Sequence, residues 1–484
     1  MDAASMAAPA LKACQSTLPI SHLQRLTSPI PLMSSRVSTK PNRVTLYSSN
    51  SSLSCCVPSF PRCSTKPDTS TDSETENTST PEPNSVSKCQ KTSDSETSEG
   101  LSSSSQSSSS RGLVFDLGPS NSWDNAEIGS PVVKRFLSDE EERWYMWYYG
   151  RSSGNPSSGS IGLAISSNGV HWERGTGPVR SGAEVGLVMN CGKDWWAFDT
   201  EGIRPSEVVI MSSSRVRSSS AVYWLYYTGY GSEKTDFKEN SLSFSLENPD
   251  RYFNSDDVNC ENCQNGKISK SLAGLAISQD GRHWARIEGE HHSGALFDVG
   301  SEQEWDSAFV SSPQVVFHGN GDLRMYYHSF DVEKGHFAIG IARSRDGIRW
   351  VKLGKIMGGG KAGSFDEFGA MNPYVVRKRG NGNYVIAYEG IAADGSRSIG
   401  MAVSPDGLKE WVRLQDEAIL KPSDKGCWDD MGVGSPCLVE MDTNADEWRL
   451  YYRGVGNGGQ GGIGMAVSQG KDTTSFTRWT GFHV

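Results

Sequence analysis

Five internal repeats constrain what this chain can fold into more than any other feature. In the clearest repeat, Trp305-Asp306 is followed by Pro313, by two strand-like segments (residues 323–329 and 338–344) and by an Asp-Gly turn. The same order of signals recurs around Asp124, Asp199, Asp366 and Asp429. Internal repetition at a fixed period indicates a repeat architecture in which each unit buries its apolar face against its neighbours.

The repeats predict the fold class. Each contains about four short segments rich in β-branched and aromatic residues, separated by Gly, Asp and Asn turns, and amphipathic helical periodicity is absent. The compact repeats span roughly 60 to 66 residues, which is longer than a WD40 blade of about 40 to 45. Because four-stranded sheets repeated radially form a propeller, we predict an all-β, five-bladed β-propeller over residues 111–484. The second repeat carries an insertion at about residues 230–271.

The N-terminal region has the composition of a targeting segment. Residues 1–67 are rich in Ser, Thr and Pro, contain seven basic residues, and have no acidic residue after Asp2. This composition predicts a plastid transit peptide and a location in the chloroplast stroma; the alternative is a plain disordered tail. Residues 68–110 are rich in Ser, Thr and Glu, and we expect them to form a disordered linker.

Charge and cysteine usage exclude several classes of function. The net charge of −10 argues against nucleic-acid binding. No apolar run approaches the ~18 residues that a membrane span needs. Half of the ten cysteines lie in the N-terminal region, so the chain has no secreted disulfide framework. The sequence implies no metal and no cofactor, and the role of the lone Cys260-x-x-Cys263 pair stays open.

The repeat itself separates structural residues from candidate functional ones. A residue that occurs in all five blades is explained by blade construction, because a propeller needs only one active site. We therefore interpret the repeated Asp as structural and expect it to cap a turn or bond backbone amides. In the Ser-x-Asp-Gly-x-x-Trp turns, Asp and Gly form a tight hairpin, and the Trp packs between blades.

Positions that differ between blades gather on one predicted face. The first strand of each blade begins, and the second ends, at the same face because the two run antiparallel. At these strand ends the five blades present a ring of polar residues: Glu127, Glu201, Arg204, His328, Asn372, Glu389 and Arg453. Such asymmetry on a symmetric scaffold is expected of a ligand site.

Five blades with an axial polar pocket resemble the clan of glycoside hydrolase families 32, 43, 62 and 68 (invertase, arabinanase and levansucrase relatives). The pattern Trp-Asp-x6-Pro, Tyr-Tyr-x-Gly, Ile-Gly-x-Ala-x-Ser and Asp-Gly-x-x-Trp is also similar to bacterial proteins labelled as glycosidases of this clan. The resemblance implies a five-bladed propeller that cleaves glycosides with carboxyl groups around the axis. The catalytic Asp-Pro motifs of that clan are missing, since the two corresponding contexts read Gly129-Ser130-Pro131 and Ile203-Arg204-Pro205. No catalytic residue is therefore transferred from the clan.

Two interpretations of the ring remain open. In an enzyme, Glu389 would be the acid and Glu127 or Glu201 the base or nucleophile, since glycoside hydrolysis needs two carboxyls about 5 to 10 Å apart. Arg204, His328, Asn372 and Arg453 would bind a carbohydrate ligand, and the cations suit a phosphorylated or acidic sugar. The alternative is a structural ion-pair network in a non-catalytic scaffold or assembly factor, with a protein partner. Only Trp195 and Trp196, which no other blade repeats, are candidates for sugar stacking.

Overall fold

The computed structural model describes residues 110–137, 142–154, 159–175, 184–211, 222–236, 267–319, 321–441, 447–457, 459, 461–469 and 472–481, all of which belong to the compact unit Leu46–Val484. Several predicted features lie outside these residues: the transit peptide, nearly all of the linker, and most of the blade-two insertion with Cys260 and Cys263. In the described part of the chain the regular elements are β-strands, and no helix there could cross a membrane.

The strands form five antiparallel units, which we call blades one to five. Blade one contains β2 (Glu127–Leu137), β3 (Glu142–Arg151), β4 (Gly159–Ser166), β5 (Glu173–Arg174) and β6 (Leu187–Met189). Blade two contains β7 (Gly202–Met211), β8 (Val222–Asp236), β9 (Lys267–Ser278) and β10 (Ala285–Ile287). The described ends of the insertion extend β8 and β9, which pair from Tyr223↔Ser278 to Asp236↔Lys267.

The remaining blades repeat this order with fewer irregularities. Blade three contains β11 (Ser311–Gly319), β12 (Asp322–Asp331), β13 (His336–Ser344) and β14 (Val351–Met357). Blade four contains β15 (Ala370–Arg377), β16 (Tyr384–Ile391), β17 (Arg397–Ser404) and β18 (Val412–Arg413). Blade five contains β19 (Gly432–Glu440), β20 (Trp448–Val455), β21 (Gly461–Gln469) and β22 (Asp472–Arg478).

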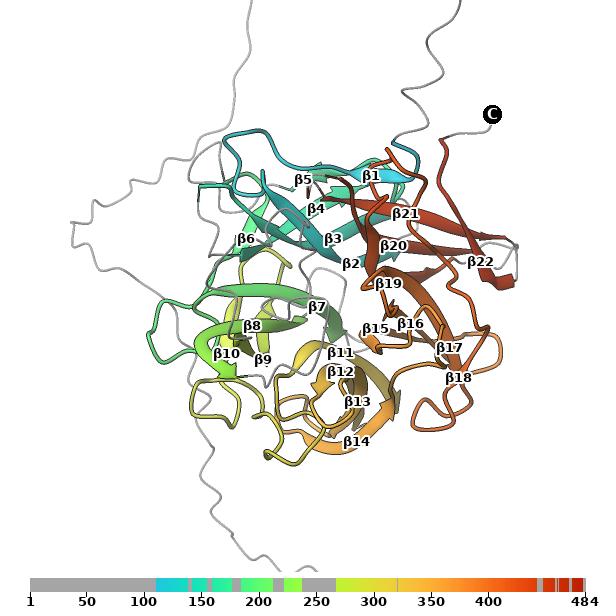
Figure 1. Ribbon diagram of the computed structural model, residues 1–484. Coiled ribbons are helices and arrows are strands. Elements are labelled where there is room, and N and C mark those ends of the chain that lie inside the picture. The colour runs from blue at the N-terminus through green and yellow to red at the C-terminus, as the bar shows by residue number, and fades with distance from the viewer. Residues whose placement is uncertain are drawn as a thin grey trace, which may run out of the picture. The chain divides into compact units, whose positions relative to one another are not determined.

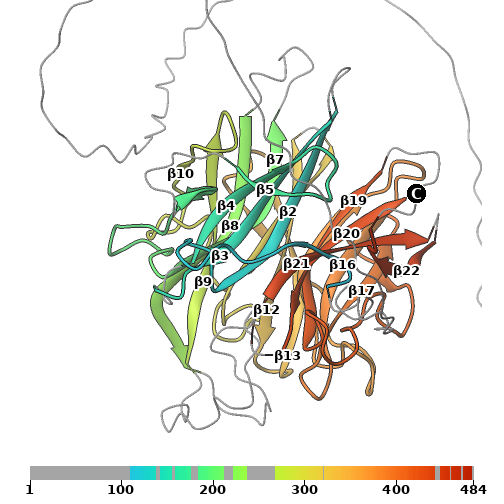
Figure 2. The ribbon, with the colours of Figure 1, turned by 90° about the horizontal axis from the view of Figure 1, so that it is seen from above.

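The first strands of the five blades follow one another around an axis. Contacts join β2 to β7, β7 to β11, β11 to β15, β15 to β19, and β19 back to β2. Figures 1 and 2 show the strands of blade five beside β2 of blade one. The predicted all-β propeller is therefore confirmed, and its core lies in the layers of aromatic and aliphatic side chains between blades.

The ring of blades is closed by the first described strand. Residues 112–118 directly precede the first repeat in the sequence, but β1 (Leu113–Phe115) pairs with β21 of blade five. Each connection between blades also pairs with a third strand, because it runs back along the third strand of the blade that it leaves. These pairings are β6 on β4, Leu296 N to Ala273 O, Met357 opposite Ile339, and Ile419 N to Ile399 O. Because β1 has the same place in blade five, it completes that blade from the other end of the propeller sequence.

The repeated aspartates are buried, and each has the same two kinds of partner. Each accepts a hydrogen bond from a tyrosine hydroxyl of the second strand at 2.9 to 3.0 Å. Each also pairs with a cation near the outer edge of its blade at 2.6 to 2.8 Å. The five triads are Asp124-Tyr148-Arg174, Asp199-Tyr227-Arg286, Asp306-Tyr327-Lys352, Asp366-Tyr388-Arg413 and Asp429-Tyr452-Arg478.

These aspartates are structural, as predicted, but their partners differ from those we expected. Among the described residues, the hydrogen bonds to these carboxylates come from side chains and not from backbone amides. Burial, and then the adjacent carboxylate, raises the pKa of all five tyrosines above the usual value, so that the hydroxyls remain donors. Each triad thereby ties the entry of the first strand to the second strand and to the blade edge.

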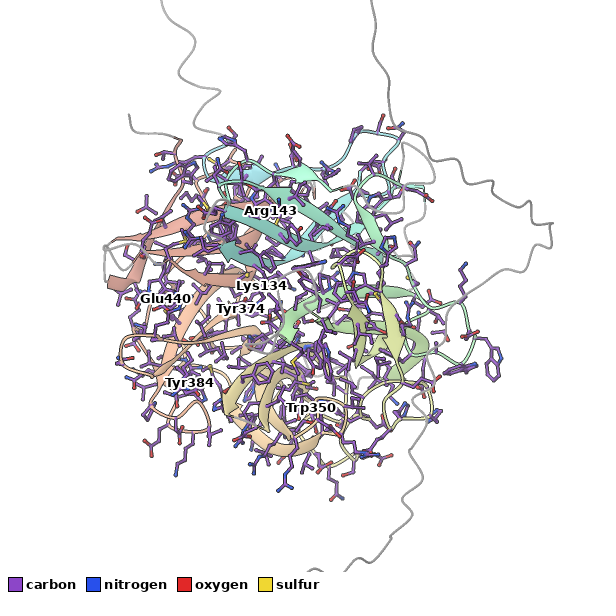
Figure 3. The ribbon with its side chains drawn as sticks, turned by 180° about the vertical axis from the view of Figure 1, so that it is seen from behind. Lys134, Arg143, Trp350, Tyr374, Tyr384 and Glu440 are labelled. Carbon is purple, nitrogen blue, oxygen red and sulfur yellow. The ribbon has the colours of Figure 1, made fainter. Side chains whose placement is uncertain are left out.

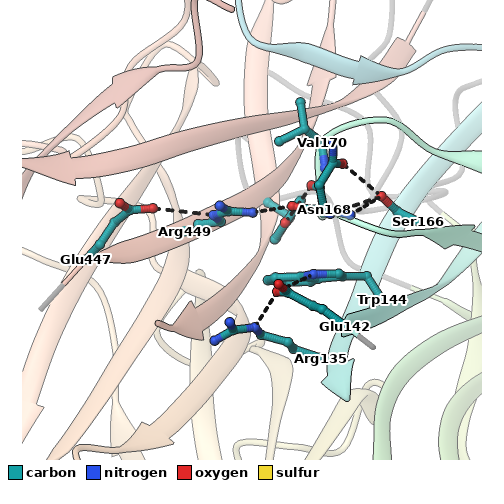
Figure 4. Close-up of polar contacts among 10 residues, drawn as sticks. Arg135, Glu142, Trp144, Ser166, Asn168, Val170, Glu447 and Arg449 are labelled. Carbon is teal, nitrogen blue, oxygen red and sulfur yellow. Dashed lines mark hydrogen bonds and ion pairs between the residues drawn. The ribbon is translucent and has the colours of Figure 1, made fainter. Parts of the chain in front are cut away.

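The repeated turns join neighbouring blades. An aromatic side chain of the preceding blade donates to the glycine carbonyl of the turn, in the pairs Tyr451–Gly169, Trp147–Gly281, Tyr226–Gly347 and Tyr326–Gly407. The same four aromatic residues meet the turn tryptophans edge to face at 6.0 to 6.3 Å. The prediction that these tryptophans pack between blades is confirmed. At the interface of blades five and one, Arg449 also donates to the carbonyl of Asn168 at 2.7 Å (Figure 4).

Removing one member of a triad should destabilise the protein in a graded way. Tyr388→Phe removes one neutral donor from Asp366 and should lower the free energy of unfolding by about 1 to 2 kcal/mol. Arg413→Met leaves the same carboxylate buried without its cation and should cost about 3 kcal/mol or more. Urea unfolding measures both changes. Tyr384→Phe is the control, because its hydroxyl has no hydrogen-bond partner among the described residues, and a loss equal to that of Tyr388→Phe would contradict the assignment.

Candidate functional site

The residue before the proline of each first strand has an unusual backbone conformation. Ser130, Ser312, Asn372 and Ser435 have φ between 46° and 52°, and the ladder to the second strand is interrupted at each of these positions. Left-handed φ is rare for residues with a Cβ, and a following proline restricts the residue further. Arg204 of blade two is the exception, because there the interruption comes between Pro205 and Glu207.

Three of the bulged residues bond the preceding blade. The amides of Ser312, Asn372 and Ser435 donate to Thr228 Oγ1, His328 Nδ1 and Glu389 Oε2 at 2.8 to 3.2 Å. These acceptors are the predicted positions at the ends of the second strands. At the two other interfaces the second-strand residue is Tyr149 or Arg453. The Arg204 guanidinium lies 4.2 Å from the Tyr149 ring, and Arg453 packs over Gly129, where an added Cβ would lie 2.6 Å from Cδ.

Glu127 is the centre of one charged cluster. Its carboxylate pairs with Arg453 at 2.8 Å, with Arg151 at 3.0 Å and with Arg204 at 3.9 Å. The three arginines come from β20, β3 and β7, so the cluster joins blades five, one and two. The structure therefore brings together three of the predicted ring residues and adds Arg151, which the sequence reasoning missed.

Glu389 is the centre of a second cluster. Oε1 accepts from Arg397 at 2.9 Å, and Oε2 accepts from Asn372 Nδ2 at 2.8 Å and from the Ser435 amide at 2.9 Å. Gly434 lies so close that an added Cβ would overlap Oε2. Asn372 in turn accepts from Ser312 Oγ at 2.6 Å. Both oxygens of this carboxylate are thus hydrogen-bonded inside the ring.

Two predicted residues are placed differently from the rest. His328 is 0% exposed, so a ligand at the surface cannot touch it. Its ring contacts the rings of Phe309 and Phe337, and its Nδ1 accepts from the Asn372 amide. The side chain of Glu201 is exposed, and its backbone amide bonds Tyr230 O. Trp195 and Trp196 are 90% and 39% exposed on the connection into blade two.

A second polar network crosses the axis farther along the first strands. Lys134 Nζ pairs with Glu207 at 2.5 Å and donates to Tyr374 OH at 3.4 Å. Gln314 donates to Glu207 at 2.8 Å and exchanges hydrogen bonds with the backbone of Val375. Cys437 accepts from the Val133 amide, and burial raises the pKa of its thiol to about 11, so it stays protonated at neutral pH.

Sequence reasoning missed this network, although a signal was present. The register aligns Val132, Glu207, Gln314, Tyr374 and Cys437 at one level of the five first strands. Five different residue types at one repeated position mark a functional or asymmetric layer, but Glu207 is displaced by the later bulge of blade two. None of the described residues forms a group of three or more His, Cys, Asp or Glu side chains that could hold a metal.

Comparison with known proteins finds similar solved structures. No protein-family model and no curated protein sequence matches the chain. The solved structure of BT0996 in an RGII complex superposes with a TM-score of 0.51 at 15% identity, over 77% of this chain and 96% of its own length. This match shows that the chain shares the fold of that structure.

Two further structures are similar at lower scores. A thermostable family-43 glycoside hydrolase matches at a TM-score of 0.45 and 16% identity, over 72% of this chain and 92% of its own length. An N-acetylgalactosamine deacetylase from F. plautii, in complex with blood group B trisaccharide, matches at 0.48 and 14% identity, over 74% and 95%. At these identities the likeness concerns the fold, and fold does not determine function.

The hydrogen bonds of Glu389 predict a stability cost for its neutral isostere. Glu389→Gln keeps the shape but loses the ion pair with Arg397 and points an NH2 group at one of three donors. We expect the free energy of unfolding to fall by about 2 to 3 kcal/mol in a urea titration. The exposed Glu302→Gln should stay within about 0.5 kcal/mol of the parent protein. Equal stability of the two variants would show that the ring contributes nothing to the fold.

Proposed function

We propose that this protein binds a carbohydrate at the face where the first strands begin, and that the ligand is a phosphorylated or acidic sugar. The observation that carries the proposal is the gathering of Arg151, Arg204 and Arg453 around Glu127 at the axis. Guanidinium groups in such clusters recognise carboxylates and phosphates through paired, charge-assisted hydrogen bonds. The three contributing strands hold the planar groups in fixed positions.

Neighbouring groups suit the remainder of a sugar. The side chains of Ser130, Ser312 and Ser435 are partly exposed at the pre-proline positions, where their hydroxyls can bond sugar hydroxyls. Tyr149 and Tyr230 flank Arg204 at 4.2 and 5.7 Å and restrict its movement. The fold shared with BT0996, which is named in a complex with RGII, supports a carbohydrate ligand by analogy alone.

Binding is better supported than hydrolysis. A glycosidase needs one carboxyl that donates a proton and a second that attacks or activates water. Glu127 is engaged by arginines, and both oxygens of Glu389 accept hydrogen bonds inside the ring. The runner-up is a non-catalytic scaffold in which the two clusters only connect the blades. The observation in its favour is that these contacts join the second strand of one blade to the first strand of the next.

The sugar-binding proposal can be tested by titration of the purified full-length protein with neutral sugars, uronic acids and sugar phosphates. We expect the anionic ligands to bind more tightly than their neutral counterparts. Arg204→Gln should weaken binding of the best sugar phosphate about 10- to 100-fold, the loss expected for hydrogen bonds to a charged group. The exposed Arg345→Gln is the matched control and should bind like the parent protein.

Turnover assays on the same panel separate the remaining alternatives. Saturable hydrolysis by the parent protein that is lost in Glu389→Gln would show that the protein is an enzyme and not only a binding protein. The melting temperature of the variant checks that it is folded. If no ligand of the panel binds, the non-catalytic scaffold is the interpretation that remains.

We also propose that the protein is delivered to plastids, because residues 1–67 are basic, rich in Ser and Thr, and nearly free of acidic residues. A reporter fused behind residues 1–67 should accumulate in chloroplasts of plant cells as a shortened product. The same fusion with its seven Lys and Arg residues changed to Gln is the control and should be imported poorly. Cytosolic accumulation of the unchanged fusion would contradict the proposal.

A further inference from the structure

A cavity of about 480 Å³ lies at the other end of the axis, between the C-terminal halves of the first strands. All five first strands line it, so it opens on the face opposite the pre-proline residues. Figure 3, which is turned by 180° from Figure 1, shows Lys134 beside Tyr374, with Glu440 farther out. Its size is within the range of small-molecule sites.

The floor of the cavity is polar and internally neutral. It consists of the network in which Lys134 pairs with Glu207 and also bonds Tyr374, while Gln314 holds the second oxygen of Glu207. Because Glu207 already balances the charge of Lys134, the floor does not favour an ionic ligand group. It ends the cavity and offers hydrogen bonds to a neutral group at most.

The walls above the floor are aliphatic and nearly symmetric. The register places Lys134 of β2 at the same level as Val209, Val316, Val376 and Val439 of the other four first strands. Four valines around one axis form an apolar collar that a hydrocarbon group would fill favourably. All four valines are among the residues that line the cavity.

Several charged residues lie at the rim of the cavity. One residue farther along the strands stand Arg135, Ile210, Phe317, Arg377 and Glu440. Arg135 pairs with Glu142 at 2.6 Å, and Arg379 lies 3.8 Å from Glu440. Arg377 is exposed, and its guanidinium lies 5.7 Å from the centre of the Tyr384 ring. Phe317 is 42% exposed beside it on the rim.

We propose that this cavity binds a small amphipathic carboxylate, independently of the sugar site. The carboxylate bonds the Arg377 guanidinium at the rim, and the hydrocarbon body lies within the valine collar and stops at the polar floor. The rim and floor levels are three residues apart, or about 10 Å at strand spacing, which suits a body of roughly six to eight carbons. A guanidinium binds a carboxylate with two parallel hydrogen bonds, so Arg377 would orient the ligand as well as attract it.

The test is a calorimetric titration of the full-length protein with acetate, butyrate, hexanoate and octanoate, and with 1-hexanol and hexyl phosphate as probes of the charged end. Affinity should rise about fourfold for each methylene between butyrate and hexanoate, as burial of hydrocarbon predicts. Hexanoate should bind at least about tenfold more tightly than 1-hexanol. This ratio is the lower end of the range expected for a hydrogen bond between charged groups. Affinity that does not depend on chain length, or tighter binding of hexyl phosphate than of hexanoate, would overturn the assignment.

Two variants locate the ligand. Arg377→Gln, at an exposed position where folding is not at risk, should reduce the preference for hexanoate over 1-hexanol to less than about threefold. Val376→Phe fills the collar and should weaken hexanoate at least tenfold, while Arg345→Gln should change nothing. Unchanged hexanoate binding in both Arg377→Gln and Val376→Phe would place the ligand elsewhere and refute the proposal.

Discussion

Burial of one carboxylate per blade is the interaction on which the rest of the structure depends. A charge removed from water is costly unless it is paired and hydrogen-bonded, so each aspartate requires both its tyrosine and its cation. Those partners come from the second strand and from the outer part of the blade. One short side chain at the entry of the first strand therefore determines where two other segments of the blade must lie. Because Asp366, Tyr388 and Arg413 recur in kind in every blade, the same geometry is reproduced five times.

The fold could be predicted from the sequence because its signals are local and repeated. Short runs of β-branched and aromatic residues, separated by Asp-Gly turns, indicated strands, and their recurrence indicated radial repetition. The structural interpretation of Asp306 and its equivalents followed from the same repetition. Their partners could not be predicted, because Lys352 and its equivalents become neighbours only when the fourth strand folds back. The place of Leu113–Phe115 in blade five was missed for a similar reason, since that pairing joins the two ends of the propeller.

The candidate sites were predicted less completely, and the reason is geometric. The antiparallel order of the first and second strands predicted one face for Glu127, Arg204 and Arg453, and the same face for Asn372 and Glu389. Sequence position did not reveal that three of the second strands contact the following blade through the amide of a bulged, left-handed residue. This offset makes Glu389 an acceptor for Ser435 of the next blade. The network of Lys134 and Glu207 was missed because blade two has its bulge one residue later than the others.

The strand β1 has a consequence for the chain as a whole. The amide of Gly112 donates to the carbonyl of Trp479 at 2.8 Å, and β1 and β22 both pair with β21. The two ends of the propeller are therefore held together by non-covalent contacts, chiefly backbone hydrogen bonds. The entropic cost of closing so long a loop grows only with the logarithm of its length, so a few backbone hydrogen bonds and Phe115 in the core can offset much of it. Because the ends already meet, the order of blades along the chain could be rotated without changing the architecture.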